Sequence, residues 1–202
     1  PELRKVKGLT SFTQAFTETN TTHKSVPMLL SPITAYNFDS IYYQKGIITA
    51  FKEAGFRTAF FSNQRYNNSL IDFLGKEADT WNFLKERAIN ANHIVYDDEL
   101  LELVSNELKS RDRKQFIVLH TYGSHFNYKE RYPSEMAFFK PDTPMDATAK
   151  NRNSLLNAYD NTIRYTDYFL ARLIRLLNEE DMNAALLYTS DHGEDIYDDD
   201  RH

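Results

Sequence analysis

The sequence predicts an α/β fold in which a largely parallel central sheet is flanked by helices. Three short apolar runs, at residues 56–62, 116–119 and 184–189, have the length and composition of buried strands. Segments with helical spacing of apolar residues separate these runs, and this alternation favours parallel strands joined by helices. Each run also ends on polar residues, which is where ligands bind in open parallel sheets.

Length and composition limit the possible function classes. The 202 residues are enough for one domain with a sizeable core. The formal net charge of -5 argues against a nucleic-acid binder, which needs a basic face. The sequence contains no cysteine, which excludes disulfides, a thiolate nucleophile and cysteine-based metal sites. No run of about 18 apolar residues occurs, so we expect no membrane span within these residues.

The first element follows a segment rich in threonine and serine at residues 20–30. Its sequence, Asn-Thr-Thr-His-Lys-Ser-Val-Pro-Met-Leu-Leu, predicts the start of a helix. The N-terminus of a helix offers unpaired N–H groups and a positive dipole end, which suit an anion. An ordinary helix cap is the alternative, and this segment alone favours the cap.

Short helices and one buried strand occupy the middle of the chain. Residues 56–62 contain almost no polar residue, which is typical of a strand buried on both faces, and Asn63 follows them. Residues 76–97 show no clear period, and Trp81 and Phe83 are expected to pack locally. The expected helices cover residues 46–55, 69–75 and 97–108.

A second strand and the longest helix follow. The strand at 116–119 ends on His120, and the loop after it contains His125. Residues 134–153 have turn residues without a clear period and are expected to form a long loop. Residues 153–177 carry an apolar stripe at helical spacing, which we interpret as core without chemistry.

The last apolar run leads directly into Thr-Ser-Asp-His-Gly-Glu at residues 189–194. Asp191 and His192 are residue types that suit zinc, and a turn after the strand would let both side chains reach one ion. A loop with a capping Asp and a surface His is the alternative. Because Asn63 and His120 fall at strand ends of the same predicted sheet, we favour the metal site. The acidic residues after position 194 are expected to form a solvated loop.

A zinc ion shared by Asp191, His192 and a residue of the first segment would activate a hydroxyl group. Thr22 is the best candidate because it lies near the predicted helix start, and a metal-activated threonine favours attack on a phosphate or sulfate ester. His120 or His125 would complete a second metal site, contact the leaving group or act as an acid. A metal-binding domain without catalysis is the alternative.

Five motifs follow one another along the chain. Residues 22–27 are Thr-His-Lys-Ser-Val-Pro, and residues 190–194 are Ser-Asp-His-Gly-Glu. The other three motifs lie within residues 51–64 (Phe-x-x-Ala-Gly-Phe and Ser-Asn-Gln), 119–133 (Leu-His-x-x-Gly-Ser-His and Arg-Tyr-Pro) and 159–167 (the long helix). In this order they resemble the motifs of bacterial phosphoethanolamine transferases, which belong to the alkaline phosphatase and sulfatase superfamily. Residues 22–27 are similar to the Thr-x-x-Ser-x-Pro nucleophile segment of that family, and residues 190–194 are similar to its metal motif.

The resemblance implies an alkaline-phosphatase-like fold and roles for the motif residues. Thr22 would be the nucleophile that transiently carries phosphoethanolamine, and also a zinc ligand. Asp191 and His192 would be further zinc ligands. His125 would lie at the second metal or phosphate site, with His120 beside it. The cofactor would be one or two zinc ions, with manganese as the alternative metal.

The resemblance also implies partners and a location. The donor would be phosphatidylethanolamine, and the acceptor would be a phosphate or hydroxyl group on an envelope glycan such as lipid A. Helices outside this chain would anchor the protein in the inner membrane, with the catalytic domain facing the periplasm. No nucleic acid is expected as a partner.

Residues 1–202 would form most of a single sulfatase-like catalytic domain that is truncated at both ends. A Glu ligand is expected before Pro1 and a His ligand beyond His202, so we expect weak zinc binding and no turnover from this piece. Met28 stands where many relatives have a cysteine, and Phe126-Asn127 replaces a usual Gly-Pro. The alternatives are a phosphoglycerol transferase, phosphodiesterase or sulfatase of the same superfamily, or a non-catalytic binding module.

Overall fold

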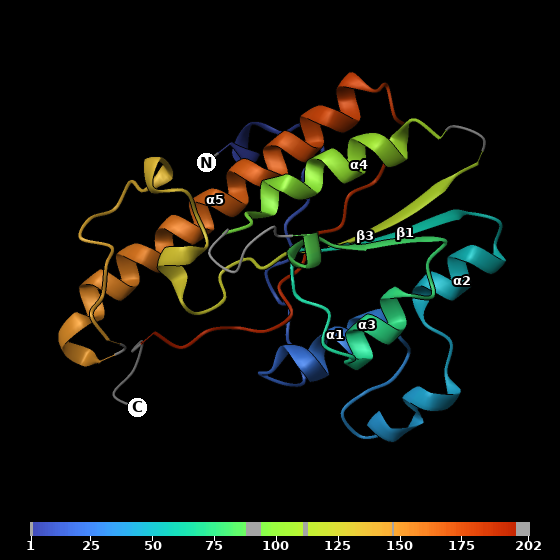
Figure 1. Ribbon diagram of the computed structural model, residues 1–202, viewed down its shortest axis with the longest axis horizontal. Coiled ribbons are helices and arrows are strands. Elements are labelled where there is room, and N and C mark those ends of the chain that lie inside the picture. The colour runs from blue at the N-terminus through green and yellow to red at the C-terminus, as the bar shows by residue number, and fades with distance from the viewer. Residues whose placement is uncertain (1, 88–93, 111–112, 147, 197–202) are drawn as a thin grey trace.

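A three-stranded parallel sheet forms the centre of the protein (Figure 1). The computed structural model describes residues 2–87, 94–110, 113–146 and 148–196. The strands run in the order β2-β1-β3, and Ser62 pairs with Phe83 on one side and with His120 on the other. The carboxyl ends of all three strands are therefore level at one edge of the sheet. The strands are β1 (Arg57–Ser62), β2 (Thr80–Phe83) and β3 (Gln115–His120).

Helices cover both faces of this sheet, which makes a three-layer α/β arrangement (Figure 1). The helices on one face are α1 (Thr22–Leu30), α2 (Ile47–Glu53) and α3 (Leu70–Gly75), and those on the other are α4 (Leu100–Leu108) and α5 (Arg152–Glu179). Short 3-10 helices occupy Leu3–Lys5, Phe38–Tyr43, Leu84–Arg87, Asp97–Glu99, Tyr128–Glu130, Ser134–Met136 and Ala149–Asn151.

β1 connects two hydrophobic cores because successive side chains of a strand point to opposite faces. Phe60 belongs to a core cluster with buried residues of α1, α2 and α3, such as Ile48 and Leu74. Ala59 and Phe61 belong to the other cluster, which contains buried residues of α4 and α5. The prediction of a strand buried on both faces is confirmed, and with it the α/β fold class.

β2 is not among the strands predicted from the sequence. This strand has only four residues, lies at the edge of the sheet, and its burial is mixed: Trp81 is exposed and Phe83 is buried. A strand of this length gives no periodic signal, and its identity depends on the neighbouring β1. Trp81 and Phe83 do pack locally, with ring centroids 5.9 Å apart.

The predicted strand at residues 184–189 is wrong. Among the described residues this segment has no pairing partner, and Leu187 in its middle is 79% exposed. An apolar run indicates a preference for burial, but a strand also needs a neighbour that accepts and donates backbone hydrogen bonds. The described part of the chain supplies no such neighbour here.

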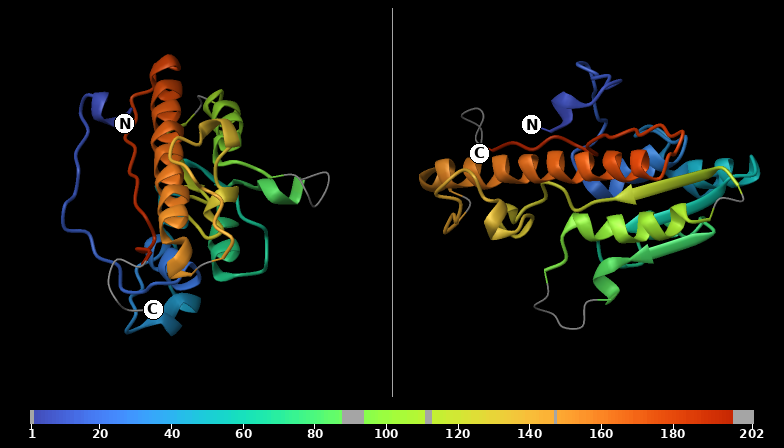
Figure 2. Two further views of the ribbon diagram at one scale, coloured as in Figure 1. Left: turned by 90° about the vertical axis from the view of Figure 1, so that its left-hand side faces the viewer. Right: turned by 90° about the horizontal axis from the view of Figure 1, so that it is seen from above.

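The chain after α5 instead doubles back along that helix (Figure 2). Met182 packs against the core cluster that contains the second half of α5, whereas Ile196 packs with Leu155 and Ala158 near the beginning of the helix. The return of the chain brings Asp191 and His192 to the N-terminus of α1. Residues 197–202, which include most of the acidic run and His202, lie outside the described residues.

No helix in the described ranges combines the length and hydrophobicity that a bilayer crossing requires. The longest, α5, has a strongly two-sided character, with buried residues such as Phe169 and Leu173 on the side that faces the sheet. Its function in the fold is to cover the sheet, as the sequence predicts.

Candidate active site

Thr22 is the first residue of α1, and Thr21 precedes it in an extended conformation. The predicted helix start is therefore confirmed, and the half-buried Thr22 hydroxyl sits where a helix dipole is positive. Thr22 Oγ1 lies 3.3 Å from His192 Nε2, although 170 positions separate the two residues in the chain. The structure thus brings together two of the residues that the sequence analysis singled out.

Asp191 is held against the same helix. Its Oδ2 atom lies 3.2 Å from Ser25 Oγ and 3.6 Å from His192 Nε2. The backbone oxygen of Asp191 also accepts a hydrogen bond of 2.9 Å from Thr17 Oγ1. Ser25 is buried and its hydroxyl is also 3.0 Å from Thr21 O, so its position is fixed by the helix itself. The sequence analysis did not identify Ser25 as an orienting residue, because its contact depends on tertiary structure.

The spacing of these donors can be compared with the needs of zinc. With bond lengths of about 2.0–2.1 Å and tetrahedral angles, two ligand atoms of one zinc ion lie roughly 3.3 Å apart. Thr22 Oγ1 and His192 Nε2 are 3.3 Å apart, and His192 Nε2 and Asp191 Oδ2 are 3.6 Å apart. No group of three His, Cys, Asp or Glu side chains that could hold a metal occurs within the described residues. The donors present fit part of a zinc site, with a threonine oxygen as the third ligand.

His120 lies at the carboxyl end of β3, close to the same residues. Its Nδ1 atom is 3.1 Å from Ser62 Oγ at the end of β1. Burial lowers the pKa of His120 to about 4, and the nearby Asp191 carboxylate opposes this shift without cancelling it. The imidazole is therefore neutral at pH 7, so one ring nitrogen donates a hydrogen bond and the other accepts one.

His125 stands apart from this group. It is exposed on the loop after β3, and its ring packs edge-on against Tyr122 with centroids 5.2 Å apart. Within the described residues, no contact joins it to Thr22, Asp191 or His192. Its predicted role at a second metal or phosphate site stays a prediction.

Asp97 is a buried carboxylate that joins the ends of β1 and β3. Its side chain accepts hydrogen bonds from Asn63 Nδ2 (2.8 Å), Tyr122 N (2.7 Å) and Gly123 N (2.9 Å). Burial raises the pKa of Asp97, and these three donors lower it. In the sequence, Asp97 is the first residue of the helix expected at 97–108. No local pattern distinguishes a buried acid from an exposed one at that position.

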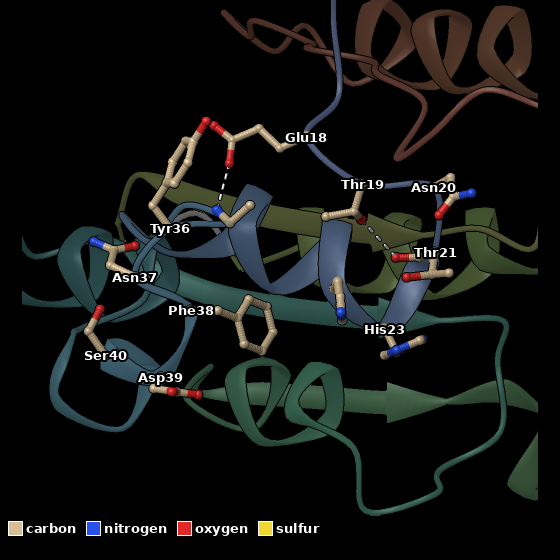
Figure 3. A pocket seen from close by; sticks show the side chains of 12 residues that line it. Glu18, Thr19, Asn20, Thr21, His23, Tyr36, Asn37, Phe38, Asp39 and Ser40 are labelled. Carbon is tan, nitrogen blue, oxygen red and sulfur yellow. Dashed lines mark hydrogen bonds between the residues drawn. The ribbon is translucent and has the colours of Figure 1, made fainter.

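An open pocket of about 960 Å³ adjoins the N-terminus of α1 (Figure 3). Its floor and walls combine carboxylates, cations and aromatic rings. Glu18 accepts a hydrogen bond of 2.6 Å from Ala35 N, which ties the two sides of the pocket together. The lining residues that carry charge or an aromatic ring are Glu18, His23, Lys24, Tyr36, Phe38 and Asp39. Thr22 is not itself a lining residue, but Thr21 and His23, on either side of it in the chain, are. Such a mixture suits a small zwitterionic group.

Comparison with known proteins agrees with this geometry. A family profile described as Sulfatase matches residues 1–202. The phosphoethanolamine transferase EptC of Escherichia coli O18:K1:H7 is 29% identical over 196 residues, which are 95% of this chain and 34% of that protein. The Kdo(2)-lipid A phosphoethanolamine 7''-transferase of Escherichia coli K12 is 29% identical over 157 residues, which are 76% of this chain and 27% of that protein.

A solved structure supports the same relationship. The C-terminal periplasmic domain of EptC from Escherichia coli, in complex with zinc, superimposes with a TM-score of 0.87 at 28% identity. The match covers 98% of this chain and 57% of that chain, whereas the chain spans about a third of the curated relatives' length. The fold is therefore alkaline-phosphatase-like. The chain belongs to the sulfatase family, and within that family it is similar to the bacterial phosphoethanolamine transferases.

Proposed function

We propose that this chain supplies most of the catalytic domain of a phosphoethanolamine transferase. The donor is phosphatidylethanolamine, and the acceptor is a phosphate or hydroxyl group of an envelope glycan such as lipid A. One observation carries the proposal: Thr22 Oγ1 lies at the N-terminus of α1, 3.3 Å from His192, with Asp191 beside it. The relatives' names support the transferred group and the class of acceptor.

The proposed reaction has two displacements at phosphorus. Thr22 Oγ1 loses its proton and bonds to the donor phosphorus, while the bond from phosphorus to the glycerol oxygen breaks and diacylglycerol leaves with a proton. An oxygen of the acceptor then bonds to phosphorus, the bond to Thr22 breaks, and Thr22 recovers its proton. The positive end of α1 attracts the phosphate in both steps.

We propose Thr22, Asp191 and His192 as zinc ligands, and His125 as the ligand of a second metal or phosphate site. The EptC domain that this chain resembles binds zinc, which supports the metal. Zinc, when bound, lowers the pKa of a hydroxyl group and neutralises phosphate charge. Ser25 orients the Asp191 carboxylate. Neutral His120 is proposed to act beside this site on the leaving group or the acceptor.

The location follows from the same resemblance. The similar EptC domain is periplasmic. We therefore propose that this domain faces the periplasm and that segments outside this chain attach it to the inner membrane.

Peptide mass spectrometry of the full-length protein tests the proposal. After incubation with zinc and phosphatidylethanolamine, the peptide that contains Thr22 should gain one phosphoethanolamine group, and Thr22→Ala should gain none. Thr49→Ala is the matched control and should still form the adduct, because Thr49 lies on α2 and its hydroxyl bonds to Glu77. A zinc-loaded protein whose Thr22 stays unmodified would contradict the proposal and would favour a binding module or another phosphoester donor.

A further inference from the structure

Each of the three parallel strands is followed by a basic residue. Arg65 comes shortly after β1, Lys85 lies in the 3-10 helix after β2, and Arg131 lies on the loop after β3. Because the carboxyl ends of the strands are level, the three segments start from one edge of the sheet (Figure 1). This is the edge at which open parallel sheets bind ligands.

Tyr122 is the centre of this group. Lys85 Nζ lies 3.7 Å from the centroid of the Tyr122 ring, and Arg131 Cζ lies 3.9 Å from it. Arg131 is fixed by hydrogen bonds from its guanidinium to the backbone oxygens of His125 (3.0 Å) and Phe126 (3.2 Å). Arg65 makes no contact with Tyr122 among the described residues, but its charge acts on Lys85 and lowers the pKa of that lysine. We refer to Lys85 and Arg131 on Tyr122, together with Arg65, as the Tyr122 basic cluster.

Basic side chains outnumber acidic ones in the cluster, although Glu130 Oε2 lies 3.6 Å from the Arg131 guanidinium. Partial burial and the charges of Arg131 and Arg65 lower the pKa of Lys85 to about 8, although Asp97 and Glu130 oppose this shift. Asp97 is already engaged with three other donors, and no carboxylate of the described residues forms an ion pair with Lys85. Lys85 and Arg131 are partly buried and Arg65 is exposed, and this local excess of positive charge favours the binding of an anion.

The cluster is close to the candidate active site. Tyr122 lies two positions after His120 at the end of β3, and its N–H donates to Asp97, which also accepts from Asn63 at the end of β1. The Asp191 carboxylate in turn acts on the pKa of His120. The cluster and the Asp191–His192 pair therefore flank one region at the sheet edge. The pocket beside Thr22 has carboxylates at Glu18 and Asp39 and lies on the α1 side.

We propose that the Tyr122 basic cluster binds an anionic phosphate group of the acceptor. The inference rests on the proposed function and adds a second binding region to it. The donor, whose head group carries an ammonium, uses the pocket with carboxylates and aromatic rings beside Thr22. The acceptor approaches from the basic side, where Lys85 and Arg65 contact its phosphate and Arg131 keeps Tyr122 and the loop in place.

The two displacements allow the proposal to be tested in the full-length protein. Lys85→Gln and Arg65→Gln should leave the formation of the Thr22 adduct from phosphatidylethanolamine unchanged. They should raise the KM for phosphorylated lipid A by about tenfold each, because a charge-assisted contact is lost. Lys85→Arg should retain most of the affinity. Lys45→Gln, which removes an exposed lysine paired with Glu53, is the matched control and should change neither step.

A second measurement tests whether the phosphate that binds the cluster belongs to the acceptor or to the donor. With a dephosphorylated acceptor that offers only hydroxyl groups, the wild type and Lys85→Gln should have the same KM. An unchanged KM for the phosphorylated acceptor would overturn the proposal, and so would an equal loss of Thr22 adduct, which would place the donor phosphate at the cluster. If the wild type forms no adduct, the proposed function fails. Equilibrium binding of phosphorylated lipid A to the wild type and to Lys85→Gln then still tests the cluster, and equal affinities would overturn it.

Discussion

Two regions of the molecule carry the candidate site, and they are held in different ways. His120 lies at the end of β3, and Asn63 follows the end of β1. The buried Asp97 side chain connects these two ends, because it accepts hydrogen bonds from Asn63 and from Tyr122 N. Asp191 and His192 lie on a returning segment that has no strand neighbour among the described residues. That segment contacts α1 only through single side chains, such as Ser25 and Thr22.

The difference separates positions fixed by the fold from positions that depend on the ligand. At the strand ends, the sheet and the buried Asp97 determine where side chains point. On the returning segment, two or three polar contacts of modest strength hold the metal-ligand candidates. We therefore expect changes at the strand ends to reduce stability, and changes around Asp191 to reduce metal affinity.

The largest expected effect on stability is that of Asp97→Ala. It removes the acceptor of three hydrogen bonds, leaves the backbone N–H groups of Tyr122 and Gly123 without this acceptor in a buried region, and leaves the Asn63 amide with only Val95 O as its acceptor. We expect the free energy of unfolding to fall by about 3 kcal/mol, measured by urea unfolding followed by circular dichroism. Asp160→Ala is the control, because Asp160 is exposed on α5. A loss of stability in Asp97→Ala as small as that in Asp160→Ala would contradict the idea that the fold fixes the strand ends.

Zinc should protect the two regions unequally. In the full-length protein, zinc at 100 times its Kd should slow amide hydrogen exchange in residues 183–194 by about 100-fold, because opening of this segment releases the metal. Amides of β1 should change much less, because the sheet is already stable without metal. Hydrogen exchange with mass spectrometry measures both. Equal protection of β1 and the returning segment would mean that zinc stabilises the whole domain.

Ser25→Ala should lower zinc affinity by about tenfold, because Ser25 orients the Asp191 carboxylate. Competition with a chelator in the full-length protein measures the change in Kd. Ser31→Ala is the matched control, since the Ser31 hydroxyl bonds to Pro27 O at the other end of α1. An unchanged affinity in Ser25→Ala would show that the Thr17 contact alone positions Asp191.

The same division explains what the sequence predicted. Local patterns were enough to predict the helices and the strands β1 and β3. Burial on both faces and helical spacing can be recognised from residues that are neighbours in the sequence. Local patterns failed for β2, which is defined by its pairing with β1, and for residues 184–189, where an apolar run has no partner. The motif residues Thr22, Asp191 and His192 were predicted to share a site, and the structure places them within contact. Ser25 and Asp97 went unrecognised because only tertiary contacts give them a role.

At the strand ends, the titration of Lys85 should have a smaller effect on the free energy of unfolding. Its pKa in the folded protein is about 8, below the ordinary value of 10.5. Between these values the unfolded state binds more protons, so stability should rise as pH rises from 8 to 10.5. Lys85→Gln should lack this contribution, which we expect to be below about 1 kcal/mol because the side chain is half exposed. The midpoint of urea unfolding at pH 7.5 and at pH 9.5 measures it, and parallel pH dependence in both proteins would contradict it.

The smallest expected effect tests the returning segment itself. Leu187 is 79% exposed, so Leu187→Ser should change the free energy of unfolding by less than about 0.5 kcal/mol. Leu100→Ser is the control and should cost several kcal/mol, because Leu100 is fully buried in the core cluster of α4 and α5. A loss of more than about 1 kcal/mol in Leu187→Ser would mean that residues 184–189 pack as a strand in solution. Asp191 and His192 would then be positioned by the fold, like His120, and zinc would not be needed to order them.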